Sequence, residues 1–271
     1  MIIVEYRTIA NYGIKNYSAW QAIGESVVGM AHRRGDIPVV CQDAYCLSNK
    51  QRPVLAVCDG AGSSVMSEVG SFYLSQSIVR LINSLEPVIN EMLDANINEK
   101  FGNKLAQILY TYSIILLQDI AANNKRTVKD FRTTLLLVVA GMKNAFWFKA
   151  GDGEIVVEKD GALERIGTSV KGEYSNETVF IDEHLKINDV QYGLLNTESV
   201  SGIALMSDGA SERLVSMDGK NIAERLLKYF DRLRNLNLPR EELHKFFTNY
   251  DNWKGTTHDD KTIVLAARKE I

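Results

Sequence analysis

Short apolar runs punctuate the chain and predict β-strands. They are rich in β-branched and aromatic residues, and they have the length of strands rather than of helices. The predicted strands run from Trp20 to Val28, Ala44 to Leu47, Val54 to Cys58, Thr133 to Ala140, Ala145 to Lys149, Ile155 to Glu158, Ile203 to Met206 and Lys261 to Ala267.

Two other regions have a helical period, with apolar residues recurring at spacings of three and four. The first, from about Val65 to Asn123, is broken near Glu86-Pro87 and therefore predicts two long helices. The second follows Asp218 and predicts another helical pair, in which Pro239 opens the second helix.

The resulting order is strands, two helices, strands, two helices and a strand. Strict βαβ alternation is absent, so a doubly wound parallel sheet fits poorly. Near-continuous apolar strands need cover on both faces, which predicts an α+β fold: a four-layer α-β-β-α sandwich of two mostly antiparallel sheets flanked by helix pairs. No repeat or linker divides the 271 residues, so a single domain, 1–271, is expected, with the weakly periodic segment 167–201 as a surface flap.

Composition and charge narrow the class of protein. Hydrophobic residues make up 45% and charged residues 24%, which indicates an ordinary folded chain. A net charge of −3 provides no basic surface for nucleic acid, so no nucleic-acid partner is expected. Neither a signal peptide nor a charge-free window of membrane-spanning length is evident, which predicts no membrane association and a cytoplasmic location. Cys41, Cys46 and Cys58 lack zinc-site spacing and are expected as core residues.

Aspartates gather where predicted strands end. An Asp-Gly pair alone is an ordinary turn signal. Here, however, the pairs at Asp59 and Asp208 lead from a strand into a helical segment, so the set suggests that the fold brings the carboxylates together. Three strands run directly into Asp59-Gly60, Asp152-Gly153 and Asp208-Gly209, the pair Asp259-Asp260 precedes the last strand, and Asp43 precedes the strand AYCL.

Such a cluster predicts divalent cations. Ionised carboxylates about 4–6 Å apart raise one another's pKa values unless cations neutralise them. Oxygen ligands favour magnesium or manganese, and two such ions about 3.5–4 Å apart activate a water for attack on a phosphoryl group. The sequence has no phosphate-binding P-loop, no dinucleotide-binding glycine motif, no HExxH and no GxSxG.

Six ordered blocks, CQDA, CDGAG, RTTLL, AGDG, LMSDG and HDDKT, resemble the metal-dependent protein serine/threonine phosphatases of the PPM (type 2C) family, in a bacterial branch with CQDA and DGAGS motifs. The resemblance covers Ala22 to Ala267 and implies two Mn²⁺ or Mg²⁺ ions and a third, weaker one. It implies that Asp59 bridges the two ions and that the Gly60 carbonyl completes the coordination shell of one of them. Asp208 and Asp259 would hold one ion, and Asp43 would lie close to the other, directly or through water. Asp152, together with Asp208, would hold the third ion.

The sequence departs from the family pattern where an arginine commonly binds the substrate phosphate, since Pro38 stands there. The nearest basic residues, Arg33 and Arg34, are therefore assigned to the phosphate.

Two further departures concern catalysis. Ala61 stands where many members have a histidine that protonates the leaving group, so a metal-bound water or His32 has to replace it. Gln42 stands in place of a glutamate, which weakens one metal site. The catalytic residues predicted are Asp59, Asp208 and His32.

The leading hypothesis is hydrolysis of phosphoserine and phosphothreonine in proteins, with the target of a serine/threonine kinase as partner. The departures at Pro38, Gln42 and Ala61 keep an alternative open, namely a catalytically weak or inactive pseudophosphatase that acts as a binding or regulatory module. A third possibility is a hydrolase of small phosphoesters.

Overall fold

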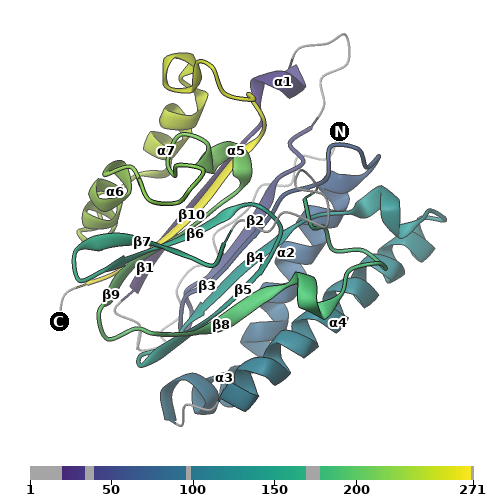
Figure 1. Ribbon diagram of the computed structural model, residues 1–271, viewed down its shortest axis with the longest axis horizontal. Helices are drawn as coiled ribbons and strands as arrows, with labels where there is room; N and C mark the ends of the chain where they lie inside the picture. The colour runs from purple at the N-terminus through teal and green to yellow at the C-terminus, as the bar shows by residue number, and fades with distance from the viewer. Residues whose placement is uncertain (1–19, 34–39, 96–98, 169–177, 270–271) are drawn as a thin grey trace.

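The computed structural model describes residues 20–33, 40–95, 99–168 and 178–269. Two five-stranded antiparallel sheets lie face to face, and helices cover the outer face of each (Figure 1). This is the four-layer α-β-β-α sandwich expected from the order of strands and helices.

The first sheet has the strand order β1-β10-β9-β6-β7. Its edge strand β1 pairs with β10, which brings the N-terminal end of the described chain beside its C-terminal end, with Trp20 opposite Arg268. The strands are β1 (Trp20–Val27), β6 (Glu154–Lys159), β7 (Ala162–Ile166), β9 (Val200–Met206) and β10 (Lys261–Arg268).

The second sheet has the strand order β2-β3-β4-β5-β8. All neighbouring strands are antiparallel. Short connections join β2 to β3 and β4 to β5, the long helices lie between β3 and β4, and the chain passes through β6 and β7 of the first sheet between β5 and β8. The strands are β2 (Ala44–Ser48), β3 (Val54–Cys58), β4 (Leu135–Ala140), β5 (Asn144–Ala150) and β8 (Gln191–Asn196).

Long helices cover the outer face of the second sheet and shorter ones the outer face of the first (Figure 1). On the second sheet lie α2 (Ser67–Ser84), α3 (Glu86–Asn90), the π-helical turn η1 (Glu91–Ala95), α4 (Glu99–Asn123) and the 3₁₀ turn η2 (Val128–Phe131). Over the first sheet lie α5 (Asp208–Ser211), α6 (Arg225–Arg234), α7 (Arg240–Thr248) and η4 (Tyr250–Trp253). The short helix α1 (Met30–Arg33) follows β1, and the 3₁₀ turn η3 (Ile187–Asp189) precedes β8.

The period of two along β3 divides its side chains between two cores. Leu55 and Val57 pack between the sheets, whereas Val54, Ala56 and Cys58 face the long helices. All five are buried, because a strand covered on both faces needs no polar side. The apolar run that predicted this strand therefore also places it at the centre of the sandwich.

Two edge strands were missed. β7 has both exposed and half-buried positions and β8 is mostly half-buried, so neither has the apolar run that marked the central strands. β8 lies inside the expected flap 167–201, and β9 begins there as well, so a flap over that whole segment is wrong. The sheet edge accounts for the difference, because β8 is covered only in part: Tyr192 and Leu194 pack toward the long helices and Leu195 toward the other sheet. Residues 169–177 of that segment lie outside the described residues.

One described helix is long and apolar enough to cross a membrane by length and composition, since Lys100–Asn123 in α4 has a mean hydropathy of 1.3. The sequence had not suggested such a segment. One face of α4 carries Leu105, Leu109 and Leu117 into the core over the second sheet, which accounts for much of its apolar character.

Candidate metal-dependent active site

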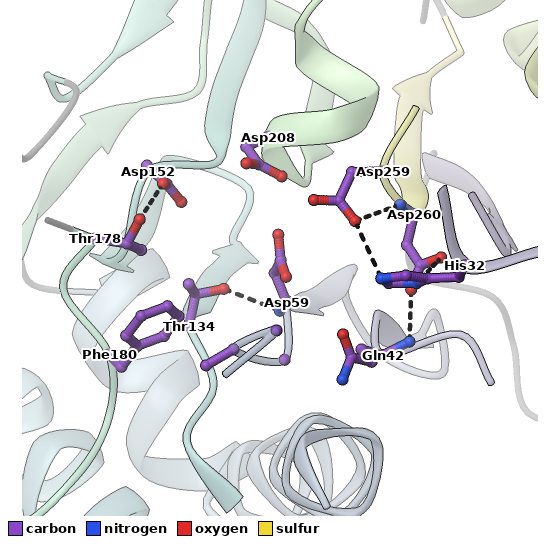
Figure 2. Close-up of a pocket in the computed structure, with 13 residues that line it drawn as sticks. His32, Gln42, Asp59, Thr134, Asp152, Thr178, Phe180, Asp208, Asp259 and Asp260 are labelled. Atoms are coloured by element: carbon purple, nitrogen blue, oxygen red, sulfur yellow. Dashed lines mark hydrogen bonds and ion pairs between the residues drawn. The ribbon is translucent and has the colours of Figure 1, made fainter. Parts of the chain in front are cut away.

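Four of the predicted aspartates converge on one cavity. Asp59, Asp152, Asp208 and Asp259 come from the ends of strands in both sheets and point toward a common space (Figure 2). The cavity has a volume of about 160 Å³. Its remaining walls are formed by His32, Gln42, Gly60, Ala61, Gly62, Thr134, Thr178, Phe180 and Asp260.

Asp59 is held by its main chain at the end of β3. Its N–H donates to Thr134 Oγ1 at 2.9 Å, and its carbonyl accepts from the Thr134 N–H at 2.8 Å and from Thr133 Oγ1 at 2.9 Å. The two threonines therefore fix the backbone that carries the central carboxylate.

Gly60 lies where two segments meet closely. Its N–H donates to the Gln42 carbonyl at 3.2 Å, and a Cβ at this position would lie 2.7 Å from that carbonyl oxygen. A side chain would push the Gln42 segment away from the cavity. The glycine after Asp59 thus permits a close approach of the two segments.

Asp208 and Asp152 stand on the side of the first sheet. The Asp208 carboxylate accepts from the Gly209 N–H at 2.5 Å at the start of α5. Asp152 lies in the turn between β5 and β6, and its Oδ2 accepts from Thr178 Oγ1 at 2.5 Å. Both side chains are thereby held toward the cavity (Figure 2).

The carboxylates strongly perturb one another. Burial, together with the charges of Asp43 and Asp208, raises the pKa of Asp59 well above its usual range. Burial and the nearby Asp152 charge raise the pKa of Asp208 to about 6. Asp59 and Asp208 face the same cavity, and each charge opposes ionisation of the other. Without a cation, this repulsion favours retention of a proton by the pair.

Asp43 lies behind the cavity rather than on its wall. It is buried, with 7% of its surface exposed, and its Oδ2 accepts from Ser207 Oγ at 2.7 Å. Burial and the Asp260 charge raise its pKa to about 8. The neighbouring Gln42, which the sequence had placed only as a departure, lines the cavity instead. Contact of Asp43 with a metal, directly or through water, stays a prediction.

His32 is on the cavity wall, opposite Asp152 (Figure 2). Its Nδ1 lies 3.0 Å from Asp260 Oδ1, and its Nε2 lies 3.8 Å from Asp259 Oδ1. Asp260, which was not singled out as a site residue, is thus the partner of the predicted catalytic histidine. The only sequence signal for it was the adjacent acid pair.

The two arginines assigned to the substrate phosphate do not join this group. Arg33 is exposed and lines a separate pocket of about 20 Å³ with Phe247 and Trp253. It follows His32 on α1 but projects elsewhere, because successive helix residues point about 100° apart. Arg34 and Pro38 lie outside the described residues.

The donor set fits hard divalent cations. Four carboxylates from separate strand ends share one small cavity, where burial and mutual repulsion raise the pKa values of Asp59 and Asp208. Carboxylate oxygens are the ligands that magnesium and manganese prefer. Asp59, Asp152, Asp208 and Asp259 would hold such ions.

The fold and the site together define a four-layer sandwich protein with an acidic cavity where strands of both sheets end. A family profile described as protein phosphatase 2C matches residues 28–248. The chain belongs to the protein phosphatase 2C (PPM) family.

Individual relatives agree with this assignment. Over 268 residues the chain is 26% identical to serine/threonine-protein phosphatase 3 of Escherichia coli (strain K12), covering 92% of this chain and 98% of the relative. Among solved structures, the fold is similar to the catalytic domain of the serine threonine protein phosphatase PstP in complex with two manganese ions, with a TM-score of 0.61, 17% identity and coverage of 93% and 99%. It is also similar to the serine/threonine phosphatase Stp1 from Staphylococcus aureus, with a TM-score of 0.60, 16% identity and coverage of 97% and 100%.

Proposed function

We propose that this protein hydrolyses phosphoserine and phosphothreonine in phosphorylated proteins, using divalent manganese or magnesium ions. The observation that carries the proposal is the convergence of Asp59, Asp152, Asp208 and Asp259 on one cavity of about 160 Å³. The E. coli relative is named a serine/threonine-protein phosphatase, and it aligns over nearly the whole of both chains, which supports the same substrate class here.

Each carboxylate has a separate task in this proposal. Asp59, at the centre, would contribute to holding both ions, with the Gly60 carbonyl beside it. Asp208 and Asp259 would hold one ion from the side of the first sheet, and Asp152 with Asp208 would hold a third, weaker one. When bound, the ions supply an activated water and neutralise the charge that develops on the phosphoryl group.

The rest of the wall orients these groups and shapes the cavity. Thr134 and Thr178 hold Asp59 and Asp152 by hydrogen bonds, and both threonines line the cavity themselves. Phe180 provides an apolar wall beside Thr178. His32 is the third catalytic residue of the proposal, with Asp59 and Asp208.

The deciding experiment measures hydrolysis of p-nitrophenyl phosphate and of a phosphothreonine peptide with and without manganese. We expect manganese-dependent turnover of both substrates by the wild type, and loss of at least about 100-fold in kcat for Asp208→Asn, which removes a metal ligand. Asp218→Asn is the matched control, because Asp218 is an exposed aspartate on a loop away from the cavity. Equal inertness of the wild type and Asp208→Asn at saturating manganese would contradict the proposal.

A pseudophosphatase used only for binding was the alternative. The cavity wall retains four carboxylates despite Ala61 and Gln42, and no observation on the described residues favours the alternative. Calorimetric titration with manganese separates the two, since a pseudophosphatase of this kind would bind no manganese at millimolar concentrations. Turnover of p-nitrophenyl phosphate without turnover of the peptide would instead indicate a hydrolase of small phosphoesters.

A further inference from the structure

The Asp260 carboxylate is occupied by three N–H donors. Its side chain is only 2% exposed. Its Oδ1 accepts from the Gly29 N–H at 2.6 Å and lies 3.0 Å from His32 Nδ1, while its Oδ2 accepts from the Gln42 N–H at 2.6 Å. Both oxygens are therefore committed to the protein. Although His32, Asp259 and Asp260 form a cluster whose ligand atoms lie within 4.8 Å of one another, Asp260 is not free to bind an ion.

This arrangement sets the tautomer of His32. A carboxylate only accepts hydrogen bonds, so the proton between the two groups sits on His32 Nδ1. The other ring nitrogen, Nε2, is then the one that faces Asp259, at 3.8 Å from its Oδ1 (Figure 2). That separation exceeds a hydrogen bond.

The position of His32 depends on close docking of α1 against the segment 258–260. The Ala31 N–H donates to the His258 carbonyl at 2.9 Å, and a Cβ on Gly29 would overlap the Asp259 main chain. The histidine is thus placed by backbone contacts as well as by Asp260. Such a fixed imidazole is typical of a group that positions an ion.

We infer that His32 Nε2 is a nitrogen ligand of the cation held by Asp259, with Asp260 as the positioning residue behind it. Ligands about 2.1 Å from an ion can lie up to about 4.2 Å apart, so one ion can contact both atoms. Histidines that bind metals usually donate their other N–H to a carboxylate, as His32 does. The inference rests on the proposed metal site and gives His32 a ligand role in place of the proton-donor role considered from the sequence.

The chemical consequence is a preference among cations. An all-oxygen site suits magnesium and manganese alike, whereas an imidazole nitrogen adds affinity for transition ions, least for manganese and more for iron, cobalt or zinc. The ion beside Asp259 is therefore expected to be a transition metal. The ions held by oxygens alone have no such bias.

Pulsed electron paramagnetic resonance of the manganese-loaded protein tests the inference without measuring activity. We expect a nitrogen coupling to Mn²⁺ that changes when the histidines carry ¹⁵N and that disappears in His32→Gln. His258→Gln is the matched control, because His258 is the other histidine beside Asp259 and stacks on Tyr250 instead. Loss of the coupling in His258→Gln but not in His32→Gln would overturn the assignment.

Affinities give a second readout. In calorimetric titrations, His32→Gln is expected to lower the ratio of manganese affinity to magnesium affinity about tenfold, and Asp260→Asn to lower manganese affinity about 10–100-fold. Thermal unfolding tests whether each variant is folded. If Asp260→Asn does not fold, the result for His32→Gln alone decides the inference. Manganese binding without a histidine coupling would overturn this inference only, whereas a wild type that binds no manganese would overturn the proposed function as well.

Discussion

Ser207 Oγ donates a 2.7 Å hydrogen bond to Asp43 Oδ2, joining residues 164 positions apart in the chain. Ser207 follows β9 of the first sheet, and Asp43 precedes β2 of the second. The bond therefore ties the two sheets together directly behind the acidic cavity. It also satisfies a carboxylate that is buried and close to other acids.

Replacement of Ser207 by alanine is expected to destabilise the protein by about 1–3 kcal/mol, because the buried Asp43 loses a donor. Urea unfolding at pH 7 measures the change. Ser84→Ala is the control, since the Ser84 hydroxyl bonds only to its own helix on the surface and should change stability far less. Equal effects of the two substitutions would show that the bond between the sheets contributes little.

Asp208→Asn should raise the stability of the metal-free protein while it abolishes turnover. The substitution removes one of the charges that repel each other around Asp59, and each pKa unit of such perturbation corresponds to about 1.4 kcal/mol. Thermal unfolding in a chelator compares the variant with the wild type and with Asp218→Asn. A lower melting temperature for Asp208→Asn than for Asp218→Asn would contradict mutual repulsion in the cavity.

The stability of the metal-free protein should fall as pH rises. The folded state holds its protons on Asp208 up to about pH 6 and on Asp43 up to about pH 8, whereas the unfolded chain releases them near pH 4. The folded state thus binds more protons over this range, so the free energy of unfolding decreases by up to about 1.4 kcal/mol per pH unit for each such proton.

Unfolding in urea between pH 5 and pH 8, with a chelator present, measures this dependence. Saturating manganese should flatten the profile, because cations replace the protons. The slope should also be smaller in Asp208→Asn. A wild-type stability that rises between pH 5 and pH 8 in the chelator would argue against retained protons.

Thr178→Val should weaken the metal site that includes Asp152. The Thr178 hydroxyl donates the 2.5 Å bond that orients Asp152 Oδ2, and a hydrogen bond to a charged group contributes about 1.5–3 kcal/mol. We expect the manganese concentration for half-maximal activity to rise about tenfold. Thr168→Val, at an exposed position near Gln191, is the control. An unchanged manganese requirement in Thr178→Val would show that Thr178 does not support the metal site.

Gly29→Ala should disturb both folding and metal binding, because the added Cβ overlaps the main chain of Asp259 and forces α1 away. A loss of more than about 2 kcal/mol in stability is expected from such overpacking. Gly102→Ala in α4 is the matched control, since its Cβ would meet only Leu194 at an ordinary 3.6 Å and alanine favours the helix. Urea unfolding and manganese titration of both variants provide the comparison.

The hydrophobic pattern alone was enough to predict the central strands, the helix pairs and the four layers. β3, for example, is apolar at every position because it is covered on both faces, and its predicted bounds coincide with those observed. The edge strands β7 and β8 escaped this reasoning, since a strand that is partly exposed has no continuous apolar run. Solvent, rather than a second layer, covers much of their surface.

Spacing along the chain also determined which aspartates stand at strand ends, because an Asp-Gly pair directly after an apolar run lies where that strand ends. Only the tertiary structure decided which carboxylates face the cavity: Asp59 and Asp208 do, Asp43 lies behind them, and Asp260 turns toward His32. The physical reason is that these directions depend on contacts between segments up to 231 residues apart, such as the bond from the Gly29 N–H to Asp260. Local sequence periodicity carries no information about such contacts.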